Sequence, residues 1–95
     1  MLEKERQEID QIDAQLMPLL AQRLKVAGQI AKVKHQDHLP LVDRQREAAI
    51  YDQVAQQVTT AQASYVQTLY ADILLVSKQY QAKLIKQWQD SENKG

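Results

Sequence analysis

Two cations interrupt the apolar face of the helix that the first part of this sequence predicts. At about 100° per residue, Arg23 lies at the centre of that face, and Lys34, eleven residues later, returns to within about 20° of it. A buried cation is unfavourable unless it is paired or hydrogen-bonded, so two inward cations indicate a site for an anion. The apolar residues of the same face are Ile9, Ile12, Leu16, Leu19, Ala27 and Ile30.

Polar side chains also occupy the inward faces of two later helices that the sequence predicts. Ser77 and Gln81 stand one turn apart on an otherwise apolar face. Glu47 falls among apolar residues at helical spacing, with Asp43 beside it and Arg46 at the edge. Any one of these is explained equally well as a hydrogen-bonded core residue or a structural ion pair. Together with the two cations of the first helix they are too many for so small a core, and they favour a polar cavity inside a helical bundle.

The composition favours an all-α protein and excludes several kinds of function. The 95 residues include two glycines, two prolines and no phenylalanine, and strong helix formers dominate. Twelve basic and twelve acidic residues cancel, which removes a general electrostatic case for binding nucleic acid or an acidic membrane. The lack of cysteine excludes disulfides, thiolate catalysis and cysteine-based zinc sites. With no secretory signal and no apolar run of the roughly 20 residues that a membrane span needs, the expected location is the cytoplasm.

Three helices account for a single predicted domain over residues 1–90, with little of the chain left for another domain. Pro40 disfavours helical geometry at the residue before it, so a break is expected between His35 and Pro40. Asp43 is suited to be the N-cap of the helix that follows. In chain order, the predicted elements are a helix from about Leu2 to Lys34, a second from Asp43 to near Thr59-Thr60, a third from about Ala63 to Trp88, and a frayed tail over 91–95.

The length of the first helix predicts an intertwined homodimer. About 33 residues at 1.5 Å each span roughly 50 Å, whereas a compact domain of this size has a radius of gyration near 12–13 Å. One end of the helix would project with Ile9 and Ile12 exposed, and a second copy would cover them. A plain coiled coil is the alternative, although the two inward cations would interrupt its seam. Pro18 is expected to kink the helix, with a division at Met17 as the other interpretation.

Arg6 lies near the N-terminal end of the first predicted helix, the end that would project from a single chain. It lies about 100° from Arg23 around the helix. In an isolated chain we would interpret it as a solvated surface residue. In a dimer, that end of the helix reaches across the partner, which would allow Arg6 to enter the cavity of the other subunit.

The polar residues described above, with Asp13, form one ordered pattern. It reads Arg6-(x)6-Asp13-(x)9-Arg23-(x)10-Lys34-(x)8-Asp43-x-x-Arg46-Glu47, followed by Ser77-x-x-x-Gln81. The individual residues are common, but the complete set closely resembles that of the all-helical (AroQ-type) chorismate mutases, from about Glu3 to Gln81. Members of that family are intertwined dimers of three-helix chains, and each of their two active sites borrows one arginine from the partner chain.

The resemblance implies the conversion of chorismate to prephenate, an intramolecular rearrangement that needs no nucleophile, metal or redox cofactor. Guanidinium groups bind carboxylates in bidentate fashion, so Arg23 and Arg6 of the partner subunit are expected to clamp the two carboxylates of chorismate. Lys34 and Gln81 are expected to donate hydrogen bonds to the ether oxygen, where negative charge grows as the C–O bond breaks. The other substrate-binding residues implied by the resemblance are Glu47 on the ring hydroxyl, the backbone near Asp43, and Arg46 and Ser77 on the carboxylates.

Two other functions stay open at this point. An isochorismate pyruvate lyase shares the fold, but lyases of that type lack the glutamate that matches Glu47. A non-catalytic helical dimerisation module is the other alternative; it predicts that Arg23→Ala and Lys34→Ala leave dimerisation intact. His35 and His38 have no third ligand at a convincing spacing, so they are expected in a surface loop rather than in a metal site.

Overall fold

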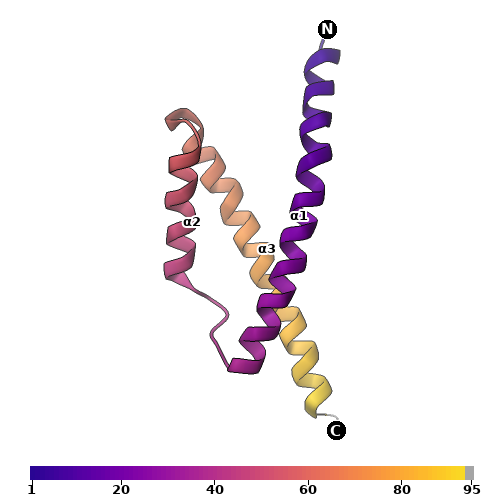
Figure 1. Ribbon diagram of the computed structural model, residues 1–95, viewed down its shortest axis with the longest axis vertical. Coiled ribbons are helices and arrows are strands. Elements are labelled where there is room, and N and C mark those ends of the chain that lie inside the picture. Colours follow the sequence, from indigo (N-terminus) through magenta and orange to yellow (C-terminus); the bar gives the residue numbers. More distant parts are fainter. Residues whose placement is uncertain (94–95) are drawn as a thin grey trace.

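Three α-helices make up the fold. The computed structural model describes residues 1–93 and contains, over that range, helices and connecting loops but no strand. The predicted all-α class with three helices per chain is therefore confirmed. None of these helices, searched over the same residues, has the length and hydropathy needed to cross a membrane. In chain order they are α1 (Glu3–Asp37), α2 (Arg44–Gln57) and α3 (Thr60–Asn93), as Figure 1 shows.

Helix α1 is continuous over 35 residues and ends three residues later than the sequence predicted. Pro18 lies inside it without dividing it, so the alternative of a break at Met17 is wrong. The helix stops at His38, which adopts a left-handed conformation with φ of 55°. The backbone N–H of His38 donates to the carbonyl of Lys34, which satisfies one of the free carbonyl groups at the end of the helix.

Helix α2 begins where the sequence predicted it. The side chain of Asp43 is its N-cap, and one carboxylate oxygen accepts a hydrogen bond from the backbone N–H of Arg46 at 3.0 Å. This bond satisfies one of the amide groups that a helix start leaves without a backbone partner. The helix ends at Gln57, slightly before the predicted boundary at Thr59-Thr60.

Helix α3 is longer at both ends than the predicted span from Ala63 to Trp88. It begins directly after the short connection from α2 and runs for 34 residues. Residues 91–93, which the sequence analysis assigned to a frayed tail, continue the helix. Residues 94 and 95 lie outside the described part of the chain.

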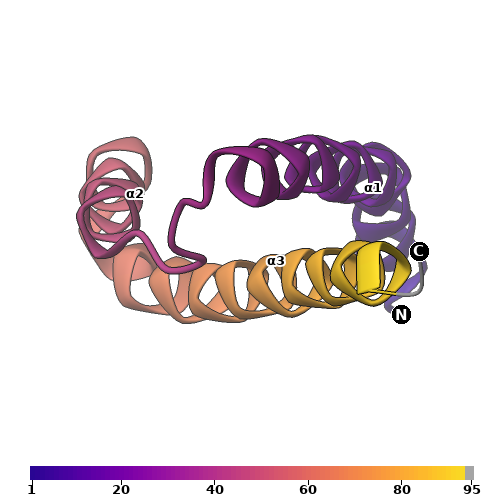
Figure 2. The same ribbon diagram turned by 90° about the horizontal axis from the view of Figure 1, so that it is seen from below.

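Helix α3 is the base on which the other two helices pack. Figure 2 shows α1 and α2 on the same side of α3, standing apart from each other. On the side of α2, the buried apolar residues are Ile50 and Val54, and Leu74 is buried on α3. On the side of α1, Ala27 and Ala31 are buried. Small side chains at a helix crossing allow the two backbones to approach closely, so α1 and α3 meet tightly at this point.

The N-terminal half of α1 extends away from the rest of the molecule (Figure 1). The chain measures 61 × 28 × 14 Å, with a radius of gyration of 17.1 Å, compared with about 13 Å for a compact domain of similar length. Ile9, Ile12 and Leu19 are 55–60% exposed. Within one chain, therefore, Ala27 is the one residue of the apolar face predicted for the first helix that is buried, and even Ile30 is 45% exposed.

Replacing Gly28 by alanine is expected to raise the free energy of unfolding by about 0.5–1 kcal/mol, because alanine has the higher helix propensity. A β-carbon at this position would meet Leu84 Cδ1 and Tyr80 Cε2 at 3.5 Å, an ordinary van der Waals distance. Urea denaturation measures the change. As the matched contrast, Ala31→Leu adds volume at a residue with 0% exposure and is expected to destabilise by about 1–3 kcal/mol. A Gly28→Ala variant less stable than the parent would contradict this packing.

Candidate active site

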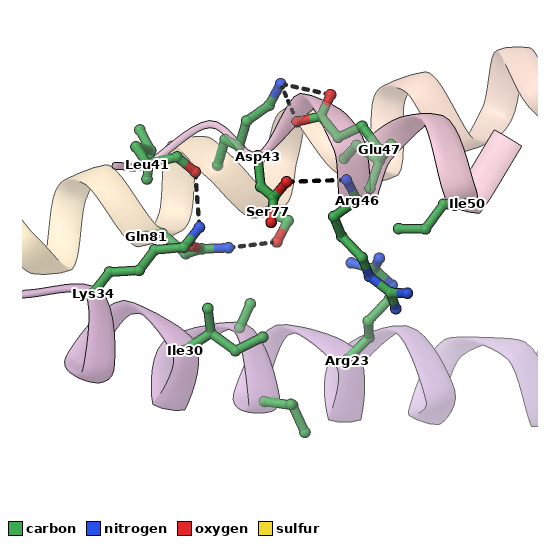
Figure 3. A pocket seen from close by; sticks show the side chains of 14 residues that line it. Arg23, Ile30, Lys34, Leu41, Asp43, Arg46, Glu47, Ile50, Ser77 and Gln81 are labelled. Atoms are coloured by element: carbon green, nitrogen blue, oxygen red, sulfur yellow. Dashed lines mark hydrogen bonds and ion pairs between the residues drawn. The ribbon is translucent and has the colours of Figure 1, made fainter. Parts of the chain in front are cut away.

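A cavity of about 440 Å³ lies between α1 and α2, over α3 (Figure 3). Its volume is in the range of small-molecule binding sites in proteins. Of the eight residues that the sequence placed at a substrate site, only Arg6 does not line it. The seven that do are Arg23, Lys34, Asp43, Arg46, Glu47, Ser77 and Gln81.

A chain of hydrogen bonds joins α1 to α3 at one end of the cavity. Lys34 Nζ donates to Gln81 Oε1 at 2.9 Å, and Gln81 Nε2 donates to Ser77 Oγ at 3.0 Å. Lys34 Nζ also donates to the carbonyl oxygen of Leu41 at 2.7 Å, in the loop before α2. Ser77 and Gln81 are buried, with 7% and 5% exposure. Two oxygen atoms thus solvate the ammonium group, which makes its partial burial tolerable.

These bonds leave hydrogen-bond donors available at the same place. An ammonium group has three N–H bonds and a primary amide has two. Within residues 1–93, the bonds of Lys34 use two of its three, and the bond to Ser77 uses one of the two on Gln81. Because the Lys34 and Gln81 side chains are bonded to each other, their remaining donors lie close enough to serve a single acceptor.

At another part of the cavity, two guanidinium groups converge. Arg23 extends from α1 and Arg46 from α2, and their side chains point toward one another (Figure 3). Neither makes an ion pair within the described residues. Two like charges held in this way repel each other, and a carboxylate bound between them would relieve the repulsion through charge-assisted hydrogen bonds.

The two carboxylates of the cavity have different partners. Glu47 on α2 pairs with Lys78 on α3, whose Nζ lies 3.1 Å from Oε2 and 3.3 Å from Oε1 of the glutamate. Asp43 caps its own helix through the bond to the backbone N–H of Arg46. The lining therefore carries four cationic side chains and two carboxylates, a difference of two positive charges. This balance favours a ligand with two negative charges.

Arg6 is remote from the cavity of its own chain. It is exposed on α1, and its separation of 17 positions from Arg23 corresponds to about 25 Å along a helix. A side chain cannot cover that distance. If Arg6 contacts a ligand of this kind of cavity, the cavity must belong to another copy of the chain.

Lys78 is the charged lining residue that the sequence analysis did not identify. The signal that could have identified it was its position three residues before Gln81, which places both side chains on one side of α3. Apolar residues also line the cavity, Ile30 on α1 and Leu74 on α3 among them. They form the walls against which a ring would pack.

The two histidines differ: His38 is exposed in the turn after α1, where a surface loop was predicted. His35 is not in a loop: it belongs to α1, and its Nε2 pairs with Glu92 Oε1 at 2.7 Å. Its ring also packs on Trp88, with 5.7 Å between the ring centroids. Through these two contacts, His35 links the C-terminal end of α1 to the last turns of α3. No group of three potential metal ligands occurs among residues 1–93.

The fold and the site define a small helical protein with a cation-rich cavity between its helices, a lining that suits an anionic ligand. Comparison with known families identifies the family: the model for chorismate mutase type II matches residues 5–82 of this chain. The chain belongs to this family, as the ordered pattern of polar residues predicted.

Two curated proteins illustrate the similarity. The T-protein of Haemophilus influenzae is 38% identical over 69 residues, which make up 73% of this chain and 18% of that protein. A chorismate mutase of Methanocaldococcus jannaschii is 39% identical over 49 residues, 52% of this chain and 50% of that protein. The chain thus spans half or less of the curated relatives it matches. Comparison with solved structures gave no significant match.

Asp43→Ala is expected to lower the free energy of unfolding by about 1 kcal/mol, because it removes the N-cap of α2. Asp43→Asn is the matched control, since its side-chain oxygen caps equally well without the charge. Thermal and urea denaturation of both variants measure the difference. Equal stability of the alanine and asparagine variants would show that the hydrogen bond to the Arg46 backbone contributes nothing.

Proposed function

We propose that this protein catalyses the rearrangement of chorismate to prephenate in the cavity between its helices. The observation that carries the proposal is the convergence of donors from Lys34 and Gln81 at one end of the cavity, opposite a pair of guanidinium groups. The family membership and the name of the Methanocaldococcus jannaschii relative support the same reaction. Such a rearrangement occurs within one molecule, so the protein's task is to bind, orient and stabilise charge.

The guanidinium groups would hold the substrate in its reactive shape. Chorismate carries two carboxylates, and the cavity has an excess of two positive charges in its lining. Arg23 and Arg46 would bind carboxylate oxygens, with the hydroxyl of Ser77 as a further contact; that all three line the cavity supports these roles. Fixing both carboxylates freezes the substrate in a compact conformer and removes the entropy that the uncatalysed reaction must lose.

Lys34 and Gln81 would act on the breaking bond. As the C–O bond of the ether breaks, negative charge develops on the oxygen. Donors that are already oriented stabilise that charge more strongly than they stabilise the ground state. The bonds to Leu41 and Ser77 hold both side chains in place before any substrate arrives, so little reorganisation is required.

Glu47 would accept a hydrogen bond from the ring hydroxyl of the substrate. It lines the cavity on the α2 side, and a carboxylate has acceptor positions beyond those that an ion pair uses. Asp43 contributes through backbone: its own carboxylate is engaged in the N-cap.

A homodimer would complete the site. The N-terminal half of α1 presents Ile12, Met17 and Leu19 at 58–65% exposure, and an apolar hollow of about 280 Å³ lies near the same helix, lined by Leu20 and Leu24 among others. A second copy packed on this surface would remove it from water. In that arrangement Arg6, too far from its own cavity, would reach the cavity of the partner.

The reaction is tested by incubating the protein with chorismate and identifying prephenate. Arg23→Ala is expected to lower kcat/KM by about 100-fold or more, because it removes a charged contact to a substrate carboxylate. Lys25→Ala, exposed on the same helix, is the matched control and should retain the parent activity. Complete inertness of the parent toward chorismate would refute the proposal. Formation of salicylate and pyruvate from isochorismate would instead assign a lyase.

Subunit exchange tests the shared site. Arg6→Ala and Lys34→Ala chains are each expected to be inactive, but a heterodimer of the two contains one site with both residues intact. After complete exchange of equal amounts, half of the dimers are mixed, so about a quarter of the parent activity should return. No recovery after exchange verified by native mass spectrometry would mean that Arg6 does not act across the dimer.

A further inference from the structure

Lys78 is a cavity residue that the reaction proposed above does not use. It stands on α3 between Ser77 and Gln81, and its ammonium group reaches across to α2. Both oxygens of Glu47 lie within 3.3 Å of its Nζ. The side chains are 27% and 23% exposed, so water screens this pair less than it screens an ion pair at the surface.

The charged neighbours of Glu47 on α2 explain why its carboxylate needs a cation on the cavity side. Asp43 precedes Glu47 by one turn on α2, and like charges at this spacing repel. Arg44, three residues before, offers an alternative partner at the exposed start of the helix. A glutamate has several accessible rotamers, so without a cation on the cavity side its carboxylate can turn toward the outside of α2. Lys78 is the cation that holds it inward.

We propose that Lys78 is a positioning residue of the active site: it holds the carboxylate of Glu47 at the cavity wall, oriented to accept a hydrogen bond from the substrate. This inference rests on the proposed function. Lys78 donates a hydrogen bond to Oε1 of Glu47 and lies 3.1 Å from Oε2 as an ion pair, so other acceptor positions of the carboxylate stay open to a substrate hydroxyl. The pair also compensates the charge of Glu47, which would otherwise repel a dianionic substrate.

The role predicts which kinetic constant changes. The ring hydroxyl does not take part in the bond rearrangement, so its contact with Glu47 is the same in the ground state and in the transition state. Loss of such an interaction raises KM and leaves kcat nearly unchanged. A loss of fold or of the donors at the ether oxygen would lower kcat instead.

The first experiment compares three variants. Lys78→Met keeps the apolar stem and removes the charge; it is expected to raise KM for chorismate about tenfold, with kcat within about threefold of the parent. Lys78→Arg, which can still bind both oxygens, should return KM to within about threefold of the parent value. Lys83→Met, on an exposed face of the same helix, is the control and should match the parent. Thermal melting followed by circular dichroism verifies that all three are folded.

The second experiment asks whether Lys78 acts through Glu47. In a Glu47→Gln background no carboxylate is left to position, so Lys78→Met should raise KM by less than about threefold. An equal rise in both backgrounds would overturn the proposal, because Lys78 would then act on the substrate by its own charge. An unchanged KM in the single variant, or a fall in kcat alone, would also overturn it. These outcomes require an active parent, whereas an inert parent would refute the proposed function itself.

Discussion

The hydrogen bonds of Lys34 are the interaction on which the rest of the cavity depends. One ammonium group at the end of α1 bonds to Gln81 on α3 and to the carbonyl of Leu41 in the loop that leads to α2. A cation in this partly buried place requires such oxygen partners, so all three segments must meet around it. The same requirement prevents the helices from closing into an apolar core and leaves a polar cavity between them.

Both walls of this cavity rest on one helix. Helix α3 carries α1 on one part and α2 on another, and the two do not pack on each other (Figure 2). The small buried residues Ala27 and Ala31 allow α1 to approach α3 closely, and the buried Ile50 and Val54 pack α2 on α3. The donors of Lys34 and Gln81 are held by hydrogen bonds before a ligand binds, which is the condition for electrostatic stabilisation of a transition state.

Helix α1 has two functions along its length. Its C-terminal half supplies Arg23 and Lys34 to the cavity, whereas its N-terminal half exposes an apolar face together with Arg6. A helix of 35 residues is about 50 Å long, more than a domain of this size can cover. Association with a second copy would bury the apolar face and bring a further arginine to the site. Stability and function would then depend on the same interface.

The sequence alone determined the kind of elements and most of the site. Helical periodicity identified five of the cavity residues as a polar set on inward faces: Arg23, Lys34, Glu47, Ser77 and Gln81. Asp43 marked the start of α2. Both signals depend only on local spacing and local hydrogen bonds, whereas the resemblance to a family added Asp43 and Arg46 to the site. The extension of α3 over residues 91–93, the pairing of His35 with Glu92 and the pairing of Lys78 with Glu47 were decided by the tertiary structure. Each depends on how one helix is rotated and displaced against another. Burial of Ala27 and Ala31 sets this for α1 on α3, and burial of Ile50 and Val54 sets it for α2 on α3, across segments distant in sequence.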